Sequence, residues 1–312
     1  MSDILGLLAG EWQRITTTLS DPVFLISQFR TGLTSAMFLF LIASGLSLIF
    51  GVLKIINFAH GSMYMIGAYM AWYMTLILSK TTLGFAGAVL VAASTVALIG
   101  LVVERFLLQF MYRREELYQL LFTYALVLIF GDACKYLWGT EPQSVSRPAA
   151  LAGSWEMFGV RLPHYDLMIL IIGPAIAFGF WLLLNRTGYG RIIRAAALDR
   201  EMLGALGTNV SRLYSGMFVL AAFLAGLAGA LVTPVKSIVP GMDVEIIIEA
   251  FIVVVIGGLG SLWGTLLGSL VYGLVLAFGI VIFPRFSIFA AFIIMAAVLI
   301  VRPWGLLGRP VK

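Results

Sequence analysis

One stretch of this sequence places hydrogen-bonding side chains inside a long apolar region. In "INFAHGSMYMIGAYM", residues 56–70, an asparagine, a histidine and a serine stand among glycines and apolar residues. Amide, imidazole and hydroxyl groups can bond a small polar solute or the exposed backbone of an interrupted helix. A buried histidine can play either part, and the residues leave both open. The candidates for a solute path here are Asn57, Phe58, His60, Gly61, Ser62 and Tyr64.

A second stretch of the same kind, "GGLGSLWGT", begins at Gly257. Glycine adopts unwound backbone conformations at low steric cost. Unwound backbone at membrane depth is tolerated only where it is buried in protein or lines a cavity. Paired interruptions in the two halves of a chain are typical of a transport path, and the N–H groups of a half-helix suit a carboxylate. The second set of candidates is Gly257, Gly258, Gly260 and Ser261.

Composition places both stretches in a membrane protein. The 312 residues are 61% hydrophobic and 11% charged, with a mean hydropathy of +1.04, whereas soluble domains carry about 25% charged residues. Residues 33–53, 81–103, 167–184 and 213–235 are free of charge, and about 20 apolar residues cross a bilayer as a helix. The sequence therefore predicts an all-α polytopic membrane protein. Its single cysteine, Cys134, excludes an intrachain disulfide.

The predicted spans form one transmembrane domain over residues 1–312, with an inverted-repeat-like arrangement. They lie near 33–53, 62–79, 83–103, 117–137, 167–184, 213–235, 246–283 and 286–301. The uncharged run 250–284 would be about 52 Å long as one helix, against a hydrocarbon core of about 30 Å. A break at 257–264 is therefore expected, which gives eight or nine membrane segments. The segment before the break either crosses the membrane fully or is re-entrant. The glycines of "LAGLAGAL", Gly226 and Gly229, are expected to serve helix packing.

Three connections rich in basic residues fall on one side by this count. They contain Arg105, Arg113 and Arg114; Arg186, Arg191, Arg194, Arg200 and Arg212; and Arg302, Arg309 and Lys312. Basic residues are retained on the cytoplasmic side, which explains the net charge of +5 better than nucleic-acid binding does. Residues 1–30, 139–166 and 236–245 then face outward, and the C-terminus is cytoplasmic. The first residues lack the pattern of a signal peptide.

Motifs for hydrolysis or ion coupling are missing from the sequence. It contains no GxxxxGK[ST] phosphate loop, no HExxH and no GxSxG, so any ATP hydrolysis is expected in a partner. Secondary carriers usually bury charged relay residues. The candidates Asp132 and Lys135 fit a local pair on one helix face instead.

The connection 185–212 combines charge with apolar residues. "GYGRIIRAAALDREMLGALG", which begins at Gly188, favours one short helix ending near Gly207. Its composition leaves two roles open, an anchor in the lipid headgroups or a docking helix for another protein. The candidate residues are Arg191, Arg194, Ala195, Ala196, Asp199, Arg200, Glu201 and Gly207.

Four ordered segments resemble the permeases of branched-chain amino-acid ABC importers. They are "FGVLKIINFAHGSMYMIGAY", "GYGRIIRAAALDREMLGALGTNVSRLYSGMFVLAAFLAGLAGAL", "VVVIGGLGSLWGTLLGSLVYG" and "RPWGLLGRP". The resemblance implies a permease of the bacterial inner membrane that binds no cofactor itself. It also implies a second related permease, two cytoplasmic ATPases that use ATP and Mg²⁺, and an external solute-binding protein. The segment 188–207 would be the coupling helix seated on the ATPase.

One position departs from the family pattern. Many members carry a glutamate directly after "AHG", where this chain has Ser62, and relatives with this scaffold carry urea, amides or aromatic acids. The solute and the choice between a homo- and a heterodimeric permease pair therefore stay open. The alternative function, a self-sufficient secondary carrier or channel for small polar solutes, would need no ATPase partner.

Overall fold

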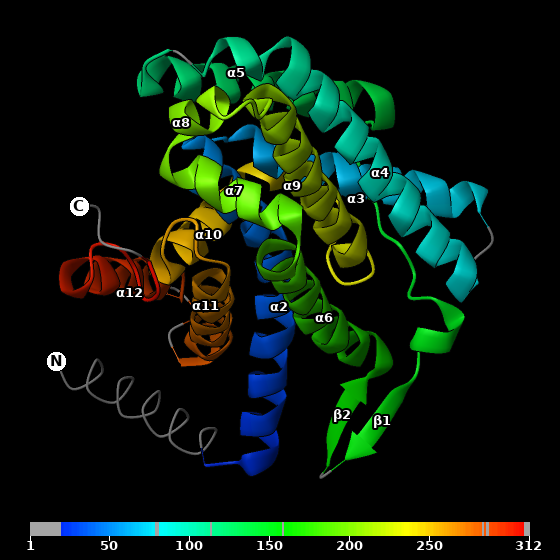
Figure 1. Ribbon diagram of the computed structural model, residues 1–312. Helices are drawn as coiled ribbons and strands as arrows, with labels where there is room; N and C mark the ends of the chain where they lie inside the picture. Colours follow the sequence, from blue (N-terminus) through cyan, green and yellow to red (C-terminus); the bar gives the residue numbers. More distant parts are fainter. Residues whose placement is uncertain are drawn as a thin grey trace, which may run out of the picture.

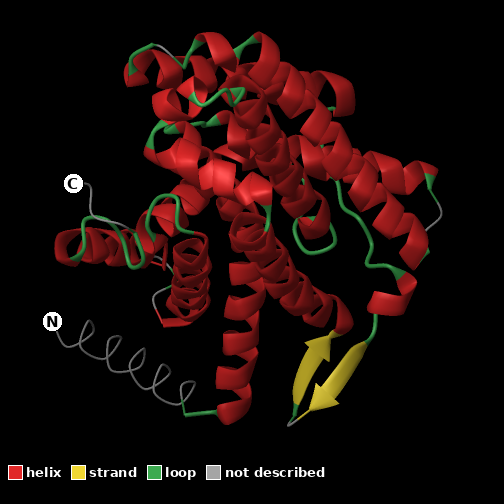
Figure 2. Ribbon diagram, viewed as in Figure 1, coloured by secondary structure: helices red, strands yellow, loops and turns green. Residues whose placement is uncertain are grey.

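The computed structural model describes residues 20–308 except 79, 80, 113, 158, 283, 285 and 286, and it is predominantly helical (Figures 1 and 2). Residues 1–19 and three of the basic residues named above, Arg113, Arg309 and Lys312, lie outside the described residues.

Helix α2 (Pro22–Leu53) runs through the centre of the molecule (Figure 1). It begins at Pro22 because the Asp21 side chain accepts a hydrogen bond from the N–H of Val23 at 2.9 Å, a standard N-cap. Its 32 residues span about 48 Å. Residues 22–30, which are expected to face outward, are the first, mostly exposed turns of this helix.

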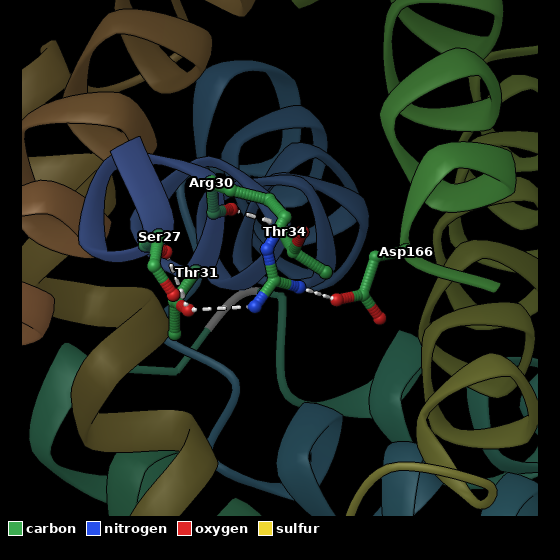
Figure 3. Close-up of polar contacts among 5 residues, drawn as sticks. All are labelled: Ser27, Arg30, Thr31, Thr34 and Asp166. Atoms are coloured by element: carbon green, nitrogen blue, oxygen red, sulfur yellow. Dashed lines mark hydrogen bonds and ion pairs between the residues drawn. The ribbon is translucent and has the colours of Figure 1, made fainter. Parts of the chain in front are cut away.

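A partly buried ion pair ties the early turns of α2 to α6 (His164–Arg186). The guanidinium of Arg30 faces the carboxylate of Asp166 (Figure 3), with side-chain exposures of 18% and 10%. Arg30 also donates to the hydroxyl of Thr31 at 3.5 Å, and Thr34 donates to the carbonyl of Arg30 at 3.0 Å. Because Arg30 has a counter-charge, it is accommodated within a helix that is otherwise apolar.

The remaining long helices pack against α2 or against its neighbours. They are α3 (Ala59–Ile77), α4 (Thr82–Phe106), α5 (Glu116–Trp138), α6, α9 (Val210–Val232), α10 (Met242–Gly257), α11 (Leu262–Ile282) and α12 (Ser287–Val301). Within the described part of the chain, six helices are long and apolar enough to cross a membrane: α2, α4, α5, α6, α9 and α11. Helix α10 has 16 residues, about 24 Å. The count of eight or nine spans, the re-entrant piece and the inverted repeat stay predictions.

Close approach between helices depends on small residues, as predicted for the two glycines of α9. A Cβ on Gly229 would lie 2.0 Å from the carbonyl oxygen of Tyr64, and one on Gly226 would lie 2.7 Å from the Cβ of Val96. These glycines therefore let α9 pack directly against α3 and α4.

A β-hairpin, which the all-α prediction missed, stands in the connection before α6. Strands β1 (Ser154–Met157) and β2 (Val160–Pro163) are antiparallel, and Gly159, with φ of 76°, lies in the turn. A turn that needs positive φ is served by glycine. The hairpin lies beside the starts of α2 and α6, away from the short helices α7 (Gly188–Leu198) and α8 (Arg200–Ala205) (Figure 1).

The basic connections gather at the end of the molecule opposite the hairpin. Arg105, at the end of α4, donates to the hydroxyl of Ser211 at 3.5 Å, which joins the connections after α4 and after α6. The segment after α12 joins them near the end of α2, because Trp304 and Glu116 line one cavity with Lys54. The described residues thus bring the three connections near one another, and the side of the membrane that they face stays a prediction.

Candidate functional site

The first interruption lies slightly earlier in the chain than predicted. Helix α2 ends because Lys54 adopts a left-handed conformation, with φ of 56°, and its N–H donates to the carbonyl of Phe50 at 3.1 Å. Helix α3 resumes after Phe58, whose carbonyl accepts from the N–H of Gly61 at 3.2 Å. The break therefore spans 54–58, and within the stretch 56–70, where the interruption was expected, His60 and its neighbours are helical.

Asn57 is fully buried in this break. Its side-chain oxygen and nitrogen have no hydrogen-bond partner among the described residues. Of the two roles left open for this amide, bonding to unwound backbone is not seen among the described residues. Buried amides are nearly always hydrogen-bonded, so Asn57 retains a donor and an acceptor for a group that is not part of the described chain.

His60 ties the first turn of α3 to the middle of α2. Its Nε2 lies 3.1 Å from the carbonyl oxygen of Ile42, and because a carbonyl only accepts, Nε2 carries the proton. The other ring nitrogen, Nδ1, is buried and has no partner in the part of the chain described. The same side chain thus fixes the break and keeps one free acceptor, which supports both of its expected roles.

Helix α10 packs against the same turn of α3. The Ser62 hydroxyl donates to the carboxylate of Asp243 at 2.8 Å, and a Cβ on Gly61 would lie 2.4 Å from the Asp243 carbonyl oxygen. The rings of Phe58 and Phe251 are 5.5 Å apart. The buried Asp243 was missed by sequence reasoning, although an acid at the start of an apolar span is a recognised signal of function. The other predicted member of this set, Tyr64, is buried one turn further along α3.

Asp132 and Lys135 form the predicted local pair, 3.0 Å apart and solvent-exposed. They therefore do not constitute a buried relay.

The second interruption lies where it was predicted. Helix α10 ends at Gly257 and α11 begins at Leu262. Gly258 and Gly260 have φ of 107° and 77°, which other residues adopt only with strain. The Ser261 hydroxyl accepts from the N–H of Gly264 at 3.1 Å and so caps α11.

The C-terminal segment covers this second break. The N–H groups of Leu306 and Leu307 donate to the carbonyls of Ile256 and Gly257 at 2.9 and 3.0 Å. They satisfy acceptors that a helix end leaves without partners. A Cβ on Gly258 would lie 2.4 Å from the nitrogen of Gly308. Sequence reasoning missed this role of "RPWGLLG". The two glycines after the proline are the signal that could have indicated it.

Both breaks contact the second half of α2. His60 bonds Ile42, and a Cβ on Gly51 would lie 2.7 Å from the Cα of Gly260. Those positions on α2 are about 13 Å apart at 1.5 Å per residue. The structure therefore brings the two predicted sets to one helix, at different depths.

A cavity of about 880 Å³ opens beside the breaks. Its walls are mostly apolar and carry two opposite charges, those of Lys54 and Glu116. The predicted residues Asn57, His60 and Ser62 do not line it. Its wall is formed by Phe50, Gly51, Lys54, Ile56, Glu116, Gln119, Val255, Leu259, Leu299, Pro303 and Trp304.

The predicted single helix 188–207 is in fact two helices. Asp199 is extended and its side chain accepts from the N–H groups of Glu201 and Met202, both at 2.9 Å. A residue that caps a new helix interrupts the preceding one. The second helix ends before Gly207, whose φ is 83°, as predicted.

The predicted docking set is exposed except for Ala196. Ala196 is 4% exposed and packs within the chain, and Arg194 donates to the carbonyl of Leu184 at the end of α6. Arg191, Ala195 and Arg200 are exposed. Three exposed apolar side chains lie beside these residues, and we call them the apolar patch: Leu198 at 81%, Met202 at 61% and Leu206 at 75%.

A polar cluster holds the neighbouring connection in place. The Tyr112 hydroxyl donates to the buried carboxylate of Glu104 at 2.8 Å, and Ser215 donates to its other oxygen. Burial and the charge of Glu104 raise the pKa of Tyr112 well above its ordinary value. Tyr112 therefore stays a neutral donor and ties the connection after α4 to α9.

Comparison with known proteins connects this arrangement to one family. The family described as branched-chain amino acid transport system, permease component, matches residues 28–301. BraD of Pseudomonas aeruginosa, a high-affinity branched-chain amino acid transport system permease protein, is 30% identical over 297 residues, 91% of this chain and 96% of its own. LivH of Escherichia coli K12, described in the same words, is 26% identical over 304 residues, 92% and 97% of the two chains. FrcC of Rhizobium meliloti, a fructose import permease protein, is 32% identical over 116 residues, 35% of this chain and 31% of its own. No solved structure matches the chain.

Proposed function

The chain belongs to the family of branched-chain amino acid transport system permease components, and we propose that it is the transmembrane permease of an ABC importer for branched-chain or other hydrophobic amino acids. The observation that carries this proposal is the match over nearly the full length of BraD and LivH. The chain is a multi-pass membrane protein and a transport component rather than an enzyme.

The solute path in this proposal runs along the second half of α2, past both breaks. Asn57 and His60 Nδ1 support it, because they are buried polar atoms without partners among the described residues. The departure at Ser62 is compatible with an amino acid, since the Asp243 carboxylate lies 2.8 Å from the Ser62 hydroxyl and places an acid at this position.

The partners in this proposal are a second related permease, two ATPase subunits and an external solute-binding protein. The membrane is the bacterial inner membrane, and the end that carries the basic connections and the C-terminus faces the cytoplasm. The ATPase docks on α7 and α8, supported by the apolar patch beside the exposed Arg191 and Arg200. ATP and Mg²⁺ act in the ATPase, and this chain binds no cofactor.

Reconstitution tests the proposal directly. The purified chain alone in liposomes should show no concentrative leucine uptake under a proton or sodium gradient. The complex with the ATPases and binding protein should concentrate leucine when ATP is supplied. Uptake driven by an ion gradient through the chain alone would establish the alternative, a self-sufficient carrier, and overturn the importer.

A pair of variants tests the second break as part of the path. Replacing both Gly258 and Gly260 by Ala imposes strained backbone at φ of 107° and 77°, so uptake should fall while membrane insertion persists. The double variant of Gly131 and Gly179 is the matched control, because nothing lies within 4 Å of a Cβ at either position.

A further inference from the structure

We propose that the cavity beside the breaks is a release site for a zwitterionic amino acid with an apolar side chain, in which Lys54 receives the carboxylate and Glu116 the ammonium group. This inference rests on the proposed function and adds the site's chemistry to it. The volume of about 880 Å³ lies within the usual range for small-molecule sites, about 300–1,000 Å³.

The cavity is built from both interruptions of the fold. Lys54 and Ile56 belong to the first break, and Leu259 belongs to the second. Asn57 directly follows the lining residue Ile56 in the chain, so a solute that passes Asn57 would reach this cavity, at the end of the molecule that carries the basic connections. That position suits release rather than capture.

Lys54 occupies a backbone conformation that normally favours glycine. It is the one residue other than glycine with positive φ in the described part of the chain, and glycine is the usual residue at such a helix end. A strained residue held by its surroundings points to a use for its side chain. Here Lys54 is exposed and lines the cavity.

Glu116 supplies the opposite charge from a fixed position. It is the first residue of α5, and Gln119, one turn later, donates to the carbonyls of Met111 and Arg114 at 3.1 and 2.9 Å. These bonds hold the start of α5 to the connection before it. The carboxylate therefore lies on a constrained turn, as a site for a directed ion pair requires.

The rest of the wall suits an aliphatic side chain. Ile56, Val255, Leu259 and Trp304 also line the cavity. The two opposite charges complement the carboxylate and ammonium groups of leucine, isoleucine or valine. The apolar walls complement their side chains. A fatty acid would match the apolar walls with its chain and Lys54 with its carboxylate, but it offers no partner to Glu116.

Three ligands, used as probes, distinguish the contribution of Lys54 to binding from that of Glu116. Leucine binding is measured on the permease–ATPase complex in nanodiscs without the solute-binding protein, beside leucinamide, which lacks the carboxylate, and 4-methylpentanoate, which lacks the amine. Lys54→Met should weaken leucine binding about tenfold or more, because a charge-assisted bond is lost, and leave leucinamide unchanged. Glu116→Gln should weaken leucine similarly and leave 4-methylpentanoate unchanged. Glu115→Gln, at a neighbouring residue that does not line the cavity, is the matched control.

The outcomes divide cleanly. Unchanged leucine binding in both variants overturns the release site, and so does an equal loss for all three probes, which would mean a structural defect. A Lys54→Cys variant that forms a disulfide between two permeases would assign the cavity to a subunit interface and also overturn it. Cys134 is buried, so this native cysteine should form few disulfides between subunits that could be mistaken for those of Lys54→Cys. ATP-driven leucine uptake by the wild-type complex is measured alongside, because its absence would reject the proposed function itself.

Discussion

Gly51 and Gly260 are in backbone contact: a Cβ on Gly51 would lie 2.7 Å from the Cα of Gly260. Gly260 is itself held at φ of 77°, so neither residue can move away without changing the second break. This contact joins the end of α2 to the connection between α10 and α11.

The first prediction concerns that contact. Gly51→Ala should reduce ATP-driven uptake strongly, although alanine at a helix position is ordinarily favoured over glycine by about 0.5–1 kcal/mol. Uptake by the reconstituted complex is the measurement, with membrane insertion assayed in parallel. Gly131→Ala is the control, since a Cβ there meets nothing within 4 Å. Normal uptake in Gly51→Ala would show that the two breaks are not coupled through α2.

The second prediction concerns Asn57. Its amide has no partner among the described residues, so Asn57→Leu should leave thermal stability in detergent equal or higher, because burying an unpaired amide costs about 1–3 kcal/mol. Leucine uptake should nevertheless fall if the amide meets the solute. A stability loss above about 1 kcal/mol would mean that Asn57 has a structural partner after all.

The third prediction separates the two roles of His60. His60→Gln keeps a donor for the Ile42 carbonyl and should preserve the fold, whereas His60→Leu leaves that carbonyl unpaired and should cost about 1–3 kcal/mol. Thermal unfolding of both variants gives the comparison. If His60→Gln folds normally but has lost uptake, Nδ1 acts on the solute. Normal uptake would assign His60 to the architecture of the break alone.

The fourth prediction concerns the pair Arg30–Asp166. Breaking a fully buried pair costs about 3–5 kcal/mol, and with these partial exposures we expect about half of that for Asp166→Ala. Replacing both residues by leucine should cost less than either single change, because no unpaired charge remains. Glu156→Ala, in the exposed pair with Arg161, is the control and should be nearly silent. Equal losses for the single and double variants would contradict this account.

The fifth prediction concerns the coupling surface. Leu198→Asp and Met202→Asp should leave the permease in the membrane but release the ATPase subunits on purification, because a charge replaces exposed apolar surface. Leu198→Met keeps the surface apolar and is the matched control. Arg191→Lys and Arg200→Lys give a second comparison, because headgroup anchoring tolerates that change whereas docking through a guanidinium does not. Full co-purification in every variant would place docking elsewhere, with the connection 107–115 next to be tested.

The sequence by itself determined the class of protein and the positions of both interruptions to within a few residues. Uncharged blocks of about 20 residues are typical of helices that cross a bilayer, and the clustered glycines permit the positive φ that Gly258 and Gly260 adopt. The order of the four motifs likewise pointed to the family, because those segments are local in the chain.

Only the tertiary structure decided which groups meet. Asp243 reaches Ser62 across 181 positions of sequence, and Ala196 turns inward while Leu198 turns out, because neighbouring helices determine which face is covered. The hairpin and the split at Asp199 were missed for a related reason, since a few residues with weak local preferences fold according to the elements beside them. The charges of Lys54 and Glu116 look unremarkable along the chain, and it is the meeting of α2, α5, α10 and the C-terminal segment that brings them to one cavity.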